Sequence, residues 1–273
     1  MTRAFSGHVM VSFIPINHTS NTMTEEIRKT LRDSAAMRWT ALLLLALAMF
    51  CAYIFVDILS PIKDLMLTQR GWDSTAFGTM QGSETFLNVF VFFLIFAGII
   101  LDKMGVRFTA VLSGAVMLFG ALIKYYAVSE SFIGSGMEAW FTAHLNYIPG
   151  FDELGVSPFY EGMPASAKVA AIGFMIFGCG TEMGGITVSR GIVKWFKGRE
   201  MALAMGSEMA LARLGVATCM IFSPFFAKLG GEVSVSRSVA FGVVLLCIAL
   251  IMLIVYFFMD KKLDSQTGET EEK

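Results

Sequence analysis

Two ionisable side chains of opposite sign, Glu182 and Arg213, stand in the middle of long apolar runs. An ionised group near the centre of a bilayer costs on the order of 3 kcal/mol on insertion scales, so each is a candidate for chemistry. Antiparallel helices joined near residue 197 would place both roughly 23 Å from the turn, at about 1.5 Å per residue. At equal depth they could bind the two ends of a charged solute in a shared cavity. The alternative is a structural ion pair, which would have to offset two desolvation costs.

Four more polar residues in apolar surroundings pair up at a spacing of four, which places each pair on one helix face. Tyr53 precedes Asp57, and Glu84 precedes Asn88. Asp57 lies near the end of its apolar run, so its carboxylate either joins the same site or reaches water at the membrane surface. We count all four among the candidate binding residues.

The apolar runs contain no histidine and no sequence motif of an enzyme or cofactor site. The histidines are His8, His18 and His144, which all lie outside the runs. There is no phosphate-binding glycine loop, no paired set of metal ligands and no nucleophile elbow. We therefore expect no enzyme activity, no metal and no cofactor. The net charge of -1 and the lack of a basic stripe give no reason to expect a nucleic-acid partner.

The elements that must position these residues are long apolar helices. The chain has 55% apolar and 16% charged residues and a mean hydropathy of +0.66, which exceeds what soluble domains show. A spanning helix needs about 20 apolar residues. Six segments qualify and predict an all-α membrane protein with six transmembrane helices: 39–61, 78–101, 107–127, 167–193, 200–228 and 237–259.

The distribution of Lys and Arg predicts the orientation of these spans. Basic residues concentrate in the N-terminal tail, in the turns 102–107 and 190–199, and in the C-terminal tail, so both termini should be cytoplasmic. We expect three regions: a cytoplasmic tail over 1–38, a transmembrane domain over 39–259, and a cytoplasmic tail or the start of a central linker over 260–273. The domain includes an irregular outer loop, 128–166, with a short helix near Met137–Leu145.

The turn after the second span has an unusual composition. It reads Gly98-Ile-Ile-Leu-Asp102-Lys103-Met-Gly105-Val-Arg107. Gly98 lies one turn before Asp102 and would let a partner helix approach, Gly105 permits a sharp reversal, and the two cations suit the cytoplasmic surface. Asp102 is a good acceptor for the exposed N–H groups of a helix N-terminus.

This pattern resembles the signature loop of major facilitator superfamily transporters, which is matched at all five named positions and departs at Phe108, where the family has a cation. The resemblance implies a half of that fold, secondary transport by alternating access, and a latch formed by Gly98, Asp102, Lys103, Gly105 and Arg107. The latch would contact a helix of the other half of the transporter.

A second stretch narrows the resemblance. Lys194-Trp-Phe-Lys-Gly-Arg-Glu200, followed by Ala212-Arg213-Leu-Gly215, is similar to the branch that contains the lysosomal dipeptide transporter, major facilitator superfamily domain-containing protein 1, and its bacterial relatives. Glu182 and Arg213 match its two charged positions, and Tyr53 and Asp57 match its first-span motif. The resemblance implies transport of dipeptides, with the amine at Glu182 and the carboxylate at Arg213.

The sequence leaves several alternatives open. Superfamily transporters usually have twelve spans in two halves with the site between them, so we expect this chain to be an N-terminal half that needs a C-terminal half or a second copy. The transported solute is a dipeptide or, alternatively, an organic anion, with or without proton coupling. A further alternative is that the protein is a membrane subunit that transports nothing. We expect a multi-pass protein of the lipid bilayer, in a bacterial inner membrane.

Overall fold

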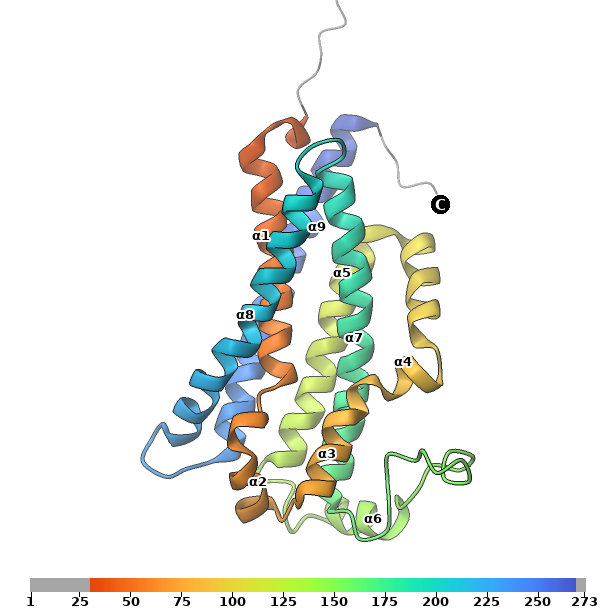
Figure 1. Ribbon diagram of the computed structural model, residues 1–273, viewed down its shortest axis with the longest axis vertical. Coiled ribbons are helices and arrows are strands. Elements are labelled where there is room, and N and C mark those ends of the chain that lie inside the picture. The colour runs from red at the N-terminus through yellow and green to blue at the C-terminus, as the bar shows by residue number, and fades with distance from the viewer. Residues whose placement is uncertain (1–29, 269–273) are drawn as a thin grey trace, which may run out of the picture.

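The computed structural model describes residues 30–268, which form helices joined by loops and contain no strand. Residues 1–29 of the expected N-terminal tail and 269–273 lie outside the described part. The α-helices are α1 (Ala35–Val56), α2 (Lys63–Arg70), α3 (Ser74–Gly82), α4 (Phe86–Phe90), α5 (Phe93–Val128), α6 (Gly136–His144), α7 (Ala165–Trp195), α8 (Met201–Lys228) and α9 (Val235–Thr267), with short 3-10 helices η1 (Leu31–Asp33), η2 (Ser60–Ile62) and η3 (Ser83–Thr85). Both ends of the described chain lie at one end of the bundle (Figure 1). We call it the termini end, and the opposite end, with α2 and α6, the loop end.

Five of the described helical segments are long and apolar enough to cross a membrane. Four of them correspond to the expected spans 39–61, 167–193, 200–228 and 237–259. The fifth, α5, contains span 107–127 and the end of span 78–101. The second of the six expected passes is not a single helix: it is broken into α3, η3, α4 and the first part of α5.

The second span departs from the expected single helix at Phe92. Phe92 has φ +54, a backbone conformation that non-glycine residues rarely adopt, and it separates α4 from α5. Beyond this break lies the segment 93–104, which we call the α5 arm. Figure 1 shows it in yellow, standing away from the bundle, and it exposes large apolar side chains such as Ile95 and Phe96. A hydropathy pattern does not reveal this break, because it lies in the backbone conformation of Phe92 and not in a loss of apolar residues.

The chain reverses direction inside α5 at Gly105. This residue has φ +79 and ψ 169, a conformation outside the helical region that glycine adopts without a Cβ clash. The reversal separates the α5 arm from the part of α5 that packs in the bundle, Val106–Val128. The sharp turn expected between the second and third spans thus lies at the glycine that the sequence pointed to.

The most extensive helix contact in the bundle joins α5 and α7. A Cβ added at Gly120 would overlap the backbone of Gly173 and Phe177, and one added at Gly173 would lie 2.6 Å from the carbonyl oxygen of Gly120. Because neither residue has a side chain, the two backbones approach far more closely than larger residues would permit. Helices α1 and α8 form a second packed pair, and α9 packs against both α1 and α5.

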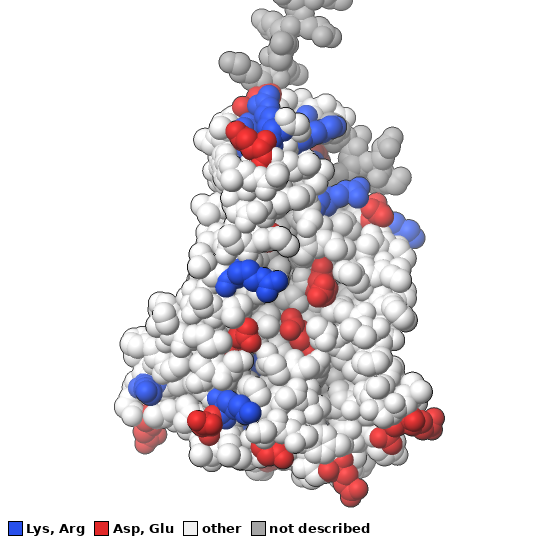
Figure 2. Space-filling view, in the orientation of Figure 1, with Lys and Arg blue, Asp and Glu red and all other residues white. Residues whose placement is uncertain are grey.

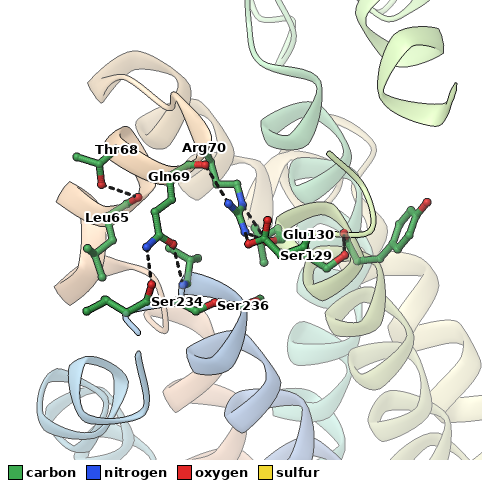
Figure 3. Close-up of polar contacts among 12 residues, drawn as sticks. Leu65, Thr68, Gln69, Arg70, Ser129, Glu130, Ser234 and Ser236 are labelled. Carbon is green, nitrogen blue, oxygen red and sulfur yellow. Dashed lines mark hydrogen bonds and ion pairs between the residues drawn. The ribbon is translucent and has the colours of Figure 1, made fainter. Parts of the chain in front are cut away.

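At the loop end, α2 ties α5 to α9 (Figure 3). The side-chain amide of Gln69 donates to the Val233 carbonyl at 2.7 Å and accepts from the Val235 N–H at 3.2 Å, at the start of α9. The guanidinium of Arg70 donates to the Val128 carbonyl at the end of α5 and pairs with Glu130 at 2.5 Å. These bonds satisfy helix-end groups that would otherwise lack partners.

The expected tails and loop differ from the structure in their boundaries. Helix α1 begins at Ala35, so the last residues of the 1–38 tail are helical, and Arg38 is buried and paired with Glu200 at 3.3 Å. Helix α9 continues to Thr267, well into the expected 260–273 tail. The short helix expected near Met137–Leu145 is confirmed as α6.

We expect Gly120→Ala to destabilise the protein, because the new methyl group would overlap the α7 backbone. Overpacking of this kind costs about 1–3 kcal/mol and should lower the thermal unfolding midpoint in detergent. Gly185→Ala is the matched control, since nothing lies within 4 Å of a Cβ at that position in α7. Equal midpoints for the two variants would show that the α5–α7 contact is looser than described.

Candidate functional site

Arg213 lies in α8 against the middle of α1. A Cβ at Gly215 would lie 3.2 Å from the Tyr53 Cβ, so the missing side chain lets α8 approach α1 at this point. The guanidinium carbon of Arg213 then sits 5.6 Å from the centroid of the Tyr53 ring, within the range of a cation–π contact. Arg213 is exposed, and within residues 30–268 it forms no ion pair.

Glu182 lies on α7 and faces a groove rather than Arg213. The groove has a volume of about 440 Å³ and runs between the α5 arm and α7. It is lined by Leu101, Glu182, Gly185, Ile186, Ser189, Arg190 and Val193. Helices α7 and α8 make few contacts, because α5 packs on α7 and α1 packs on α8. The described residues therefore contain no ion pair between Glu182 and Arg213, and both side chains are exposed.

Asp57, Glu84 and Asn88 lie where the first two passes bend: Asp57 at the end of α1, Glu84 in η3 and Asn88 in α4. Asp57 ends α1 and accepts a hydrogen bond from the Ser60 hydroxyl at 3.1 Å. Glu84 belongs to η3. The backbone carbonyl of Glu84 lies where the Cβ of any residue larger than glycine would stand at position 178. The Asn88 amide donates to the Gly178 carbonyl at 3.4 Å. The absence of a side chain at Gly178 thus brings the broken second pass against α7.

Lys124 is a functional candidate that the sequence analysis missed. Lys124 lies near the end of the apolar run 107–127, where a lysine is expected to reach the membrane surface, yet its side chain is fully buried in α5. Its ammonium nitrogen lies 3.5 Å from the centroid of the Phe174 ring and 5.2 Å from that of Phe55. In the described part of the chain this nitrogen has no hydrogen-bond partner. Its place near the end of an apolar run made it look like a residue that reaches the membrane surface.

These groups form one charged region. Glu84 interacts electrostatically with Lys124, Glu182 and Asp57, which come from three different helices or their ends. Arg213 joins the region through Tyr53, which lies one helical turn before Asp57. We call Tyr53, Asp57, Glu84, Glu182 and Arg213 the central charged face. Figure 2 shows basic and acidic side chains in the middle of a mostly uncharged face, while many other charges gather at the two ends of the molecule.

The residues of the expected latch have different surroundings. Asp102 is exposed and makes a long ion pair with Arg190 of α7 at 3.4 Å. Arg107 donates to Asp264 of α9 at 2.8 Å. Lys103 is exposed. Gly98 has nothing within 4 Å of a Cβ position, so the close helix contact expected there is not made within the described chain.

A buried ion network holds α7 against α9 at the termini end. Asp260 is fully buried and accepts from the Lys194 ammonium at 2.6 Å, the Trp195 indole at 2.8 Å and the Tyr256 hydroxyl at 3.3 Å. Lys194 also pairs with Asp264 at 2.7 Å. The expected tail after residue 259 is therefore helical because its two carboxylates find cations and donors within the bundle.

No group of three His, Cys, Asp or Glu residues that could hold a metal ion occurs among the described residues. The ionisable groups of the central charged face can instead bind charged or zwitterionic groups by ion pairing and hydrogen bonding.

The long apolar helices and the charged face within them define a multi-pass integral membrane protein. A family model described as Major Facilitator Superfamily matches residues 45–273. The chain therefore belongs to the major facilitator superfamily, whose members are secondary membrane transporters of small molecules and are generally not enzymes. No curated protein and no solved structure matches the chain.

We expect Asp260→Asn to destabilise the protein by about 1–3 kcal/mol, because it removes one counter-ion of the half-buried Lys194, which keeps its ion pair with Asp264. Asp102→Asn is the matched control at the same end of the bundle; its ion pair is exposed on both sides and should be worth less than about 1 kcal/mol. Thermal unfolding in detergent measures both. A midpoint for Asp260→Asn equal to that of Asp102→Asn would contradict a stabilising role for the network.

Proposed function

We propose that this transporter moves small peptides, with dipeptides as its main solutes, by alternating access. The proposal combines the branch resemblance with the chemistry of the central charged face. We place the termini end in the cytoplasm, in line with its basic turns and tails, and the protein in a bacterial inner membrane.

The observation that carries the proposal is the separation of Glu182 and Arg213. They have opposite charges, lie on helices that barely touch, and are exposed rather than paired with each other. A structural ion pair would bring the two together, because each is costly to leave unpaired inside a membrane. A dipeptide carries an ammonium at one end and a carboxylate at the other, so it could satisfy both groups at once.

The balance of charge favours a peptide over an organic anion. Beside Glu182 the face carries Asp57 and Glu84, while Arg213 is its one exposed cation among the described residues. Three carboxylates would repel a solute with negative charge only, and they would attract an ammonium group. Tyr53 and Asn88 add a ring and an amide that can contact the uncharged parts of a peptide.

The α5 arm supports the mechanistic part of the proposal. Its large apolar side chains and Gly98 face away from the bundle, and Asp102 at its end is exposed. We propose that this surface receives a helix of a C-terminal half or of a second copy, with Asp102 accepting from the helix N-terminus in one of the two transport states. Lys103 and Arg107 would keep the turn at the membrane surface.

Uptake of a labelled dipeptide by the purified native protein in proteoliposomes tests the solute. We expect Arg213→Ala and Glu182→Gln each to lower the initial rate at least about tenfold, as the loss of 1.4 kcal/mol of solute binding would. Gel filtration would confirm that each variant remains folded.

Matched controls come from the same helix. Lys228→Ala removes an exposed cation at the end of α8, and Glu208→Gln neutralises a carboxylate about 140° around α8 from Arg213. Both should transport at the wild-type rate. Wild-type uptake in both test variants would overturn the assignment, and inhibition by simple carboxylates but not by dipeptides would identify an organic-anion transporter instead.

A further inference from the structure

The groove beside Glu182 contains a second charge of opposite sign on the same helix. Its α7 wall is formed by residues at helical spacing, from Glu182 through Gly185 and Ser189 to Arg190. Glu182, Ser189 and Arg190 are all exposed, whereas the opposite face of α7 is buried in the bundle. One groove therefore carries a carboxylate at the level of the central charged face and a guanidinium nearer the termini end.

The separation of these two charges matches the length of a short zwitterion. Arg190 follows Glu182 by eight residues, which corresponds to a rise of about 12 Å along an α-helix. Both side chains lean toward the helix N-terminus, so their tips keep roughly this separation. An extended dipeptide spans about 7 Å, and a charge-assisted hydrogen bond adds about 2.8 Å at each end. A dipeptide lying along the groove can therefore reach Glu182 with its ammonium group and Arg190 with its carboxylate.

Small side chains leave room for a solute between the two charges. Gly185 has no side chain, and nothing lies within 4 Å of the position of a Cβ there. The Ser189 hydroxyl donates to the Gly185 carbonyl at 2.9 Å, so its oxygen can still accept from a peptide N–H group. The groove volume of about 440 Å³ falls within the range of small-molecule sites.

The present partner of Arg190 is weakly held. The guanidinium pairs with Asp102 of the α5 arm at 3.4 Å, and the two side chains are 61% and 70% exposed. Exposed pairs of this kind contribute little stability. A solute whose ammonium group is already held by Glu182 presents its carboxylate to Arg190 at a high effective concentration, so it can displace Asp102.

We propose that the groove is a second solute-binding position, in which Glu182 holds the ammonium group of the solute and Arg190 replaces Arg213 as the partner of its carboxylate. Occupation of this position displaces Asp102 and frees it for the helix N-terminus of a C-terminal half or of a second copy. The solute thereby moves toward the termini end and releases the α5 arm in the same step. The inference rests on the proposed function and adds the position that serves the termini end.

Protection of a cysteine in the groove tests this position directly. The reporter is Ile186→Cys, which lies between the two charges, in a Cys247→Ser background whose other three cysteines are buried. A small charged methanethiosulfonate reagent labels the protein in detergent. A dipeptide with free termini, at ten times its KM for uptake, should slow labelling about tenfold, because only the unoccupied groove reacts.

Two controls show that the protection is specific. The N-acetylated dipeptide lacks the ammonium group and should not protect the reporter. Lys197→Cys, in the turn after α7, is exposed at the same end of the bundle but does not line the groove, so its labelling should be the same with and without dipeptide.

Substitutions in the reporter background identify the residue that holds the carboxylate. Arg190→Gln should abolish protection, because it removes the only cation among the residues that line the groove, whereas Arg213→Ala should leave protection intact. Protection that is lost in Arg213→Ala but kept in Arg190→Gln would overturn the inference.

Asp102→Asn tests the displacement of the latch residue. It removes the competitor for Arg190 and should lower the half-protecting concentration of the dipeptide, by up to about fivefold for a pair worth about 1 kcal/mol. A purely structural role of the ion pair predicts no such gain, and an unchanged or higher concentration would overturn the displacement.

The second position and the proposed function fail separately. Uptake of the dipeptide without protection of the reporter would overturn the second position and leave the proposed function standing. Protection without uptake would support the groove as a binding site and overturn dipeptide transport. Neither uptake nor protection would overturn both.

Discussion

Helices α5 and α7 cross at Gly120 and Gly173 so closely that a methyl group at either residue would overlap the other helix. The charged residues on α5, α7 and η3 depend on this contact. It places Lys124, one turn beyond Gly120, in the interior of the bundle, and the same face of α7 continues to Gly178, where η3 and Glu84 are seated. In a membrane, where apolar side chains gain little by leaving lipid for protein, such close packing is a main source of helix association.

The ionisable groups inside the bundle fall into two kinds. At the termini end, Asp260, Asp264, Lys194 and Arg107 satisfy one another across α5, α7 and α9. On the central charged face, Glu182 and Arg213 remain exposed and apart. Paired charges hold helices together, whereas unpaired ones keep their electrostatic attraction for a ligand. For this reason we assign a structural role to the paired charges at the termini end and a role in solute binding to the central charged face.

The broken second pass also shapes the surroundings of the central charged face. The α5 arm leaves the bundle at Phe92 and returns at Gly105, so the groove beside Glu182 is walled on one side by a segment with few contacts of its own. Segments with few buried contacts move at low energetic cost. A surface that is apolar, weakly held and next to the charged face is well placed to pack against another transmembrane element as the transporter changes state.

The class of the protein could be predicted from the sequence, because apolar runs of membrane length and the glycine and charge spacing of one turn do not depend on how the helices pack. The sequence also located Glu182, Arg213, Tyr53, Asp57, Glu84 and Asn88 as polar groups in apolar surroundings. Periodicity within one helix does not say which helices touch. Four features become visible only in the folded chain: α7 and α8 stay apart, the second pass breaks at Phe92, α9 continues to Thr267, and Lys124 is buried against aromatic rings. Each of these depends on contacts between residues far apart in the chain, where glycine gaps and opposite charges meet.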